Sequence, residues 1–216
     1  AFNLDVKYAG ETVASKLARI REEMKEAGTN VHVVSTIDDI CWTLNIRGND
    51  IDFFPLVLSY GIITMDSFEL YIDEKKLDDK LKAKLAKDGV NLHPYNDIYE
   101  DVKKFGSDVV AMIDPGKLNY ALFNNIPENV KTVEKRNPAI LMKAIKNPVE
   151  IENIRKAQIK DSVAHVRFMK WLKENVGKMR ITEMSASDKL DEFRAEMGNF
   201  IRPSFEPISS FGEHGA

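Results

Sequence analysis

Hydrophobic and polar positions alternate most clearly between Thr36 and Asp73, a stretch that also holds the longest apolar block of the chain. Residues 56–65 are apolar on both alternating faces, which predicts a strand buried on two sides. Asp66–Ser67 is a polar turn, and residues 68–73 alternate again with one more polar face. Two strands joined so closely predict an antiparallel hairpin, which we place at the centre of a sheet.

The segment from Asp38 to Gly48 has a different pattern, because two acidic residues precede apolar residues at positions 40, 42, 44 and 46. It predicts a short helical or irregular piece that Asp38 and Asp39 cap and that ends at Gly48. The two aspartates could also form a paired-carboxylate site. Capping is the interpretation that we favour.

The other periodic segments of the first 135 residues alternate between helices and strands. We expect helices at 12–27, 74–88, 97–105 and 118–125, and strands at 31–35, 90–94, 108–114 and 130–133. In the first of these helices, Thr12 is placed to cap the start and Gly28 the end. This pattern predicts an α/β domain with a sheet of about five strands and helices around it.

The pattern changes near Asn137–Pro138, and we expect a domain boundary within residues 136–146. A long helix is predicted from Pro148 to about Asn175, and Thr182 caps a second helix that runs to about residue 197. The tail from residue 200 predicts strand and turn. Two helices and a strand are too little to enclose a core. The first domain or a second copy of the chain could cover their apolar stripe, or the segment could be partly disordered.

Composition narrows the class of protein. The 216 residues are 44% hydrophobic and 30% charged, as in a soluble globular protein, and the net charge of -3 gives no basic surface for nucleic acid. A single cysteine, Cys41, excludes an internal disulfide and fits a cytoplasmic protein. No apolar run reaches the roughly 20 residues that cross a bilayer. The N-terminus carries neither a secretion signal nor an initiator Met, so we expect the chain to begin inside a longer protein or after processing.

Several polar residues resemble local sites, but a structural role explains most of them. Asp161 and His165 lie one helical turn apart without an evident third metal ligand, so a solvated pair is favoured. Cys41 lies in an apolar run and is not expected to be a nucleophile. In Arg47–Gly48, the glycine permits a close turn. The arginine could hold a carboxylate across a domain or subunit boundary, or contact substrate, and we favour the ion pair.

Five strings along nearly the whole chain together resemble one enzyme family. They are LDVKYAGETVASKLARIREEM, STIDDICWTLNIRGNDI, LSYGIITMDSFELYID, NPAILMKAIKNPVEIENIRKAQIKDSVAHVRFMKWL and ITEMSASDKLDEFRAE with PSFEPISSFGEHGA. The set resembles the three-domain Xaa-Pro aminopeptidases, also called aminopeptidase P. The resemblance implies that residues 1–140 form a creatinase N-terminal-like, ribonuclease-H-like domain with a mixed sheet. It implies that residues 141–216 are the truncated opening of an α+β pita-bread peptidase domain.

The resemblance also implies an activity for the longer parent protein. Members cleave the bond between an N-terminal residue and a following proline, using a water activated by two divalent metal ions, often Mn(II). Two aspartates, one histidine and two glutamates hold these metals, and a separate histidine assists. By resemblance all of these residues follow Gly215–Ala216, so we expect this fragment to contain no catalytic and no metal-binding residue, to hold no cofactor and to be inactive alone.

The resemblance assigns two further residues and the partners. By resemblance, Phe205 lies on the strand that borders the substrate pocket, although packing alone explains it equally well. Phe205 and, from the residue pattern alone, Arg47 are the candidate substrate-binding residues. His214 matches a variable turn residue, not the catalytic histidine. The implied partners are peptides with proline at the second position, with no nucleic acid and no membrane, and a homodimer is one possible assembly.

The alternative is a non-catalytic creatinase-like or pita-bread module that binds peptides or proteins, because a fold alone does not fix a function. The downstream reading frame separates the two hypotheses. An Asp, Asp, His, Glu, Glu set there supports the peptidase, and its loss supports the binding module.

Overall fold

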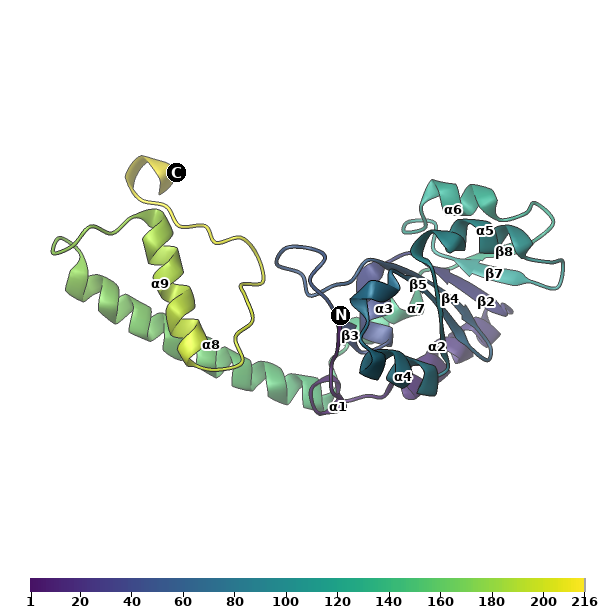
Figure 1. Cartoon of the computed structure of the whole chain (residues 1–216), viewed down its shortest axis with the longest axis horizontal. Coiled ribbons are helices and arrows are strands. Elements are labelled where there is room, and N and C mark those ends of the chain that lie inside the picture. The colour runs from purple at the N-terminus through teal and green to yellow at the C-terminus, as the bar shows by residue number, and fades with distance from the viewer. Residues whose placement is uncertain (216) are drawn as a thin grey trace. The chain divides into compact units, whose positions relative to one another are not determined.

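The computed structural model describes residues 1–215 (Figure 1). The chain divides into two compact units. The first comprises residues 1–51 and 55–147, and the second comprises residues 52–54 together with the chain from Pro148 onward. The division expected at residue 140 stays a prediction, although helix α7 (Pro138–Ala144) falls within the first unit.

A six-stranded mixed sheet forms the centre of the first unit. Its spatial order is β6-β5-β4-β2-β7-β8, with the bounds β2 Val31–Val34, β4 Ser59–Thr64, β5 Phe68–Ile72, β6 Val90–His93, β7 Val110–Ile113 and β8 Lys131–Glu134. Strand β4 is antiparallel to both β2 and β5, and the remaining neighbours are parallel. The predicted α/β class with a mixed sheet is confirmed, although about five strands were expected.

The predicted hairpin is present as β4 and β5; β4 lies at the centre of the sheet as expected, whereas β5 is next to the outermost strand β6. Strand β4 begins at Ser59 because the residues before it make other bonds: Leu58 N–H donates to the Asp50 carboxylate at 2.8 Å. Within the hairpin, a Cβ on Gly61 would lie 2.6 Å from the ring of Phe68 on β5, so only glycine allows this close approach. A separate two-stranded sheet pairs β1 (Phe2–Asn3) with β3 (Ile46–Arg47) and was not foreseen.

Helices cover both faces of the six-stranded sheet. One face carries α2 (Val13–Glu26), α3 (Ile37–Thr43), α4 (Asp79–Lys87) and α7, and the other carries α5 (Ile98–Asp101) and α6 (Tyr120–Asn125), as Figure 1 shows. Alternation along the strands divides the core in two. On β4, Ile63 packs with α2 and α4, whereas its neighbour Ile62 packs with α5 and α6. A short helix α1 (Val6–Ala9) lies near the N-terminus.

Two predicted helices are divided in the structure. The charged segment 74–88 forms a 3₁₀ turn at Glu74–Lys76 and then α4, because the Asp78 carboxylate accepts the Leu81 N–H at 2.7 Å and starts a new helix. The segment 97–105 consists of α5 between two 3₁₀ turns, at Tyr95–Asp97 and Val102–Lys104.

The second unit contains α8 (Pro148–Asn175) and α9 (Glu183–Glu196), close to the predicted bounds. Thr182 caps α9 as expected, through a capping box with Ser185. The predicted strand in the tail is wrong for the described residues: positions 200–211 form no regular structure, and a 3₁₀ turn follows at Gly212–Gly215. The described part of this unit offers no strand with which the tail could pair, so its backbone cannot form a sheet ladder.

Candidate functional site

The carboxyl ends of the parallel strands β2, β7 and β8 meet at one edge of the sheet, which is the usual place for sites in open α/β folds. A buried polar network occupies this edge. His32 on β2 is completely buried, with Nδ1 3.1 Å from the Met112 carbonyl oxygen and Nε2 3.2 Å from Oδ1 of Asn137.

Asn137 is the centre of this network. Its Oδ1 accepts the Ala139 N–H at 3.0 Å and so caps α7, while its Nδ2 donates to the Asp39 carboxylate at 2.9 Å. Its own N–H donates to Oδ2 of Asp114 at 2.9 Å. These partners fix which end of the amide is oxygen, because Oδ1 faces a donor and Nδ2 faces a carboxylate.

Asp38 and Asp39 join α3 to α7 through Lys143. The ammonium of Lys143 donates to Asp39 at 2.7 Å and also pairs with Asp38. Burial lowers the pKa of Lys143, but these two carboxylates outweigh it and raise the pKa above its usual value. The predicted capping role is wrong. The N-cap position belongs to Thr36, and both carboxylates are used by the ammonium from a helix far along the chain.

The environment of His32 favours a neutral imidazole. Burial lowers its pKa, and the neighbouring hydrogen bonds and carboxylates only partly oppose this effect. Both ring nitrogens face acceptors, the Met112 carbonyl oxygen and Oδ1 of Asn137, and a neutral ring, which has one N–H, can donate to only one of them. Since the ring has no exposed surface, the network holds helices to the sheet and cannot exchange protons directly with a substrate.

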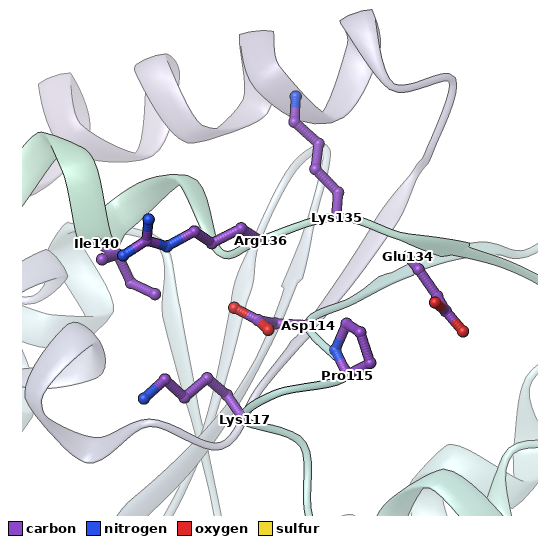
Figure 2. A pocket seen from close by; sticks show the side chains of 7 residues that line it. All are labelled: Asp114, Pro115, Lys117, Glu134, Lys135, Arg136 and Ile140. Atoms are coloured by element: carbon purple, nitrogen blue, oxygen red, sulfur yellow. The ribbon is translucent and has the colours of Figure 1, made fainter.

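Beside this network lies a pocket of about 380 Å³ in the first unit. Figure 2 shows the side chains that line it, which are Asp114, Pro115, Lys117, Glu134, Lys135, Arg136 and Ile140. They lie at the end of β8, directly after β7 and β8, and in the first turn of α7. The pocket therefore has three basic and two acidic residues around an apolar wall.

The two candidate substrate-binding residues lie in different units. Arg47, in the first unit, donates from Nη1 to the carbonyl oxygens of Cys41 at 3.0 Å and Ile46 at 2.8 Å, which ties β3 to α3. Phe205, in the second unit, lies in a bend and is 68% exposed. Substrate contact by either residue stays a prediction.

The remaining candidate residues have structural environments. His214 is exposed in its turn, as expected, and its Nδ1 lies 2.9 Å from the Glu183 carboxylate. His165 Nδ1 and an Asp161 oxygen are 3.4 Å apart, and Asp161 also accepts from Arg194 on α9 at 2.8 Å. Cys41 is fully buried, and burial raises the pKa of its thiol, so it is a poor nucleophile.

The donor set of the described residues does not fit a metal centre. Within residues 1–215, no three side chains of histidine, cysteine, aspartate or glutamate are grouped so that they could hold an ion. None of the helices described is both long and apolar enough to span a membrane.

Comparison with known proteins identifies the class of protein. Residues 1–150 match the creatinase/prolidase N-terminal domain, and residues 152–216 match metallopeptidase family M24. The chain therefore belongs to the creatinase/prolidase N-terminal domain family and continues into sequence of the M24 type.

Its relatives in this family are Xaa-Pro aminopeptidases. The chain is 36% identical to a probable Xaa-Pro aminopeptidase P of Neurospora crassa, over 100% of this chain and 33% of the relative. It is 38% identical to Xaa-Pro aminopeptidase 1 of Dictyostelium discoideum, over 100% of this chain and 35% of the relative. The chain thus spans about a third of the length of these relatives, and the predicted family is confirmed.

Solved structures support the same assignment. An X-prolyl aminopeptidase of Caenorhabditis elegans, described as a cytosolic enzyme with a di-nuclear active site, matches 99% of this chain and 38% of its own, with a TM-score of 0.91 and 30% identity. An Xaa-Pro dipeptidase of Bacillus anthracis matches 87% of this chain and 50% of its own, with a TM-score of 0.62 and 16% identity, which shows the fold alone.

The sequence did not predict that His32, Asn137 and Lys143 belong to one network. Two local signals were present: a histidine inside the β-branched run of residues 31–34, and Asn137 before Pro138, the usual arrangement of a helix cap. Their contacts join residues about 100 positions apart, and no local pattern reports such a separation.

Proposed function

We propose that the protein to which these residues belong is an Xaa-Pro aminopeptidase that hydrolyses the bond between an N-terminal residue and a following proline. The observation that carries this proposal is the similarity along the whole chain to the Caenorhabditis elegans X-prolyl aminopeptidase, at a TM-score of 0.91 and 30% identity. The sequence relatives, at 36% and 38% identity over the full chain, support the same activity.

The proposed enzyme uses two divalent metal ions, with Mn(II) as our choice of metal. The M24 match and the di-nuclear site of the similar worm enzyme support a two-metal centre. Because the described donors do not fit such a centre, we assign no catalytic step to them. In this proposal residues 1–140 restrict access to the active site, so that only short or flexible peptide N-termini enter. We also propose a cytosolic location, as described for the worm enzyme.

The test compares two polypeptides. One is residues 1–216, and the other is the product of the complete reading frame. Each receives a peptide with proline at the second position, with and without Mn(II), and release of the first residue is measured. We expect turnover from the complete product with Mn(II), but neither turnover nor binding of two Mn(II) ions by residues 1–216.

An inactive complete product whose sequence lacks the Asp, Asp, His, Glu, Glu set would instead support a non-catalytic binding module. Turnover by residues 1–216, with stoichiometric Mn(II) in calorimetry, would overturn the proposal that this segment is inactive alone. In the complete enzyme, Phe205→Ala tests the pocket role, since loss of a substrate contact lowers kcat/KM whereas a packing role alone lowers only the urea midpoint of unfolding.

A further inference from the structure

The pocket beside the buried network contains charges that the fold does not use. Within residues 1–215, the ammonium of Lys117 and the guanidinium of Arg136 make no hydrogen bond and no ion pair, and both side chains are exposed. Lys135 differs, since its ammonium lies 2.8 Å from the Glu23 carboxylate. The pocket therefore has two cationic groups available for a ligand.

Asp114 supplies a negative charge in the same pocket. Its Oδ1 accepts the Gly116 N–H at 3.1 Å and its Oδ2 accepts the Asn137 N–H at 2.9 Å, so backbone groups hold the half-buried carboxylate in place. Among the described residues no cation pairs with it. A carboxylate has about four lone-pair positions, so Asp114 can accept further hydrogen bonds from a ligand.

The three charged groups lie on the same side of the pocket. In Figure 2 the side chains of Asp114, Lys117 and Arg136 turn toward one side, whereas Glu134 points away from them. Their backbones are well fixed. Lys117 N–H donates to the Asp114 carbonyl at 3.0 Å, and its own carbonyl accepts from the Ser35 hydroxyl at 2.8 Å.

This combination distinguishes between classes of ligand. A plain anion would be attracted by the two cations but repelled by Asp114. A plain cation would be attracted by Asp114 but repelled by the two cations. A zwitterion satisfies both signs of charge. The volume of about 380 Å³ and the apolar side chains of Pro115 and Ile140 suit a small molecule with an apolar part.

We propose that this pocket binds a free α-amino acid, with the ligand carboxylate at Lys117 and Arg136 and its ammonium at Asp114. The apolar wall then favours an aliphatic side chain. The site lies in the first unit and holds its ligand without cleaving any bond, so the proposal is independent of the proposed peptidase activity.

The test uses the 216-residue chain and four small probes. L-leucine carries both charges, N-acetyl-leucine only the carboxylate, leucinamide only the ammonium, and inorganic phosphate is a simple anion. Binding is followed by NMR through the amide signals of Gly116, Lys117 and Asn137. We expect leucine to shift these signals saturably at millimolar concentration, and each of the other probes to bind at least about tenfold more weakly.

Two variants complete the test. The double variant Lys117→Gln/Arg136→Gln should lose leucine binding, while leucinamide is affected little. The control Lys131→Gln removes an exposed lysine from the opposite end of β8 and should bind leucine like the wild type. Absence of a saturable leucine shift, equal binding in the double variant, or phosphate or N-acetyl-leucine binding as tight as leucine would each overturn the proposal. The probe series on the wild-type chain decides the matter even if the double variant does not fold.

Discussion

Substitution of Asn137 by alanine gives the sharpest test of the buried network. The change removes the cap on α7, a contact worth about 1 kcal/mol. It also removes the donor to Asp39, and a hydrogen bond to a buried charged group is worth about 1.5–3 kcal/mol. Because Asp39 keeps Thr36 and Lys143 as partners, we expect a total loss of about 2–4 kcal/mol in the free energy of unfolding.

Two companion variants separate the two contributions. Asn119 caps α6 through a bond to the Leu122 N–H and also hydrogen-bonds the Tyr99 side chain, so Asn119→Ala gives an upper limit for the cost of a cap, which is about 1 kcal/mol. Asn137→Asp keeps the acceptor that caps α7 but places a carboxylate opposite Asp39. It should therefore destabilise the first unit at least as much as Asn137→Ala.

Urea unfolding followed by tryptophan fluorescence measures these losses. In a Trp171→Phe background the only remaining reporter is Trp42, which is buried in the core of the first unit. With a slope near 2 kcal/mol per molar urea, a loss of 3 kcal/mol lowers the midpoint by about 1.5 M. If Asn137→Ala lowers the midpoint no more than Asn119→Ala does, the contact with Asp39 contributes nothing and the reasoning fails.

Three further predictions concern other buried groups. Burial lowers the pKa of His32, so the unfolded chain binds a proton at this residue more readily than the folded chain does. The free energy of unfolding should therefore fall as the pH drops below about 6.5. Urea midpoints measured from pH 7.5 to 5 should show this fall, and His32→Phe should make it smaller. Gly61→Ala forces a methyl group against Phe68 and should cost about 1–3 kcal/mol by the same assay, and an unchanged urea midpoint would contradict the close contact. Cys41 should react with a thiol reagent at least about a hundredfold more slowly in the native chain than in urea, and rapid native labelling would contradict its burial.

The fold could be predicted wherever the hydrophobic pattern was regular and long. The hairpin of β4 and β5, helix α2 and the Thr182 cap of α9 all follow from local residue order. The predictions failed where a polar side chain competed locally, as at Asp78, which divides a helix in two. They also failed in the tail, because a strand needs a second strand to pair with, and the hydrophobic pattern of the tail does not show whether one is present.

The candidate site was harder to predict because its contacts are distant in sequence. Asp38 and Asp39 have the local pattern of a helix cap, and only the folded chain places Lys143 beside them. The two exposed cations of the pocket, Lys117 and Arg136, stand among ordinary surface charges in the sequence. Lys117 and Arg136 line the same pocket because β7 and β8 are neighbours in the sheet, and the order of residues does not specify which strands are neighbours.

The two outermost strands of the sheet, β6 and β8, determine how the sheet could associate with another chain. Each has only four residues, and each presents polar or charged side chains, such as His93 on β6 and Lys131 on β8. An edge this short and this hydrophilic offers a foreign strand few backbone hydrogen bonds and little apolar surface. Growth of the sheet from molecule to molecule, the first step of amyloid-like aggregation, is therefore disfavoured at both margins.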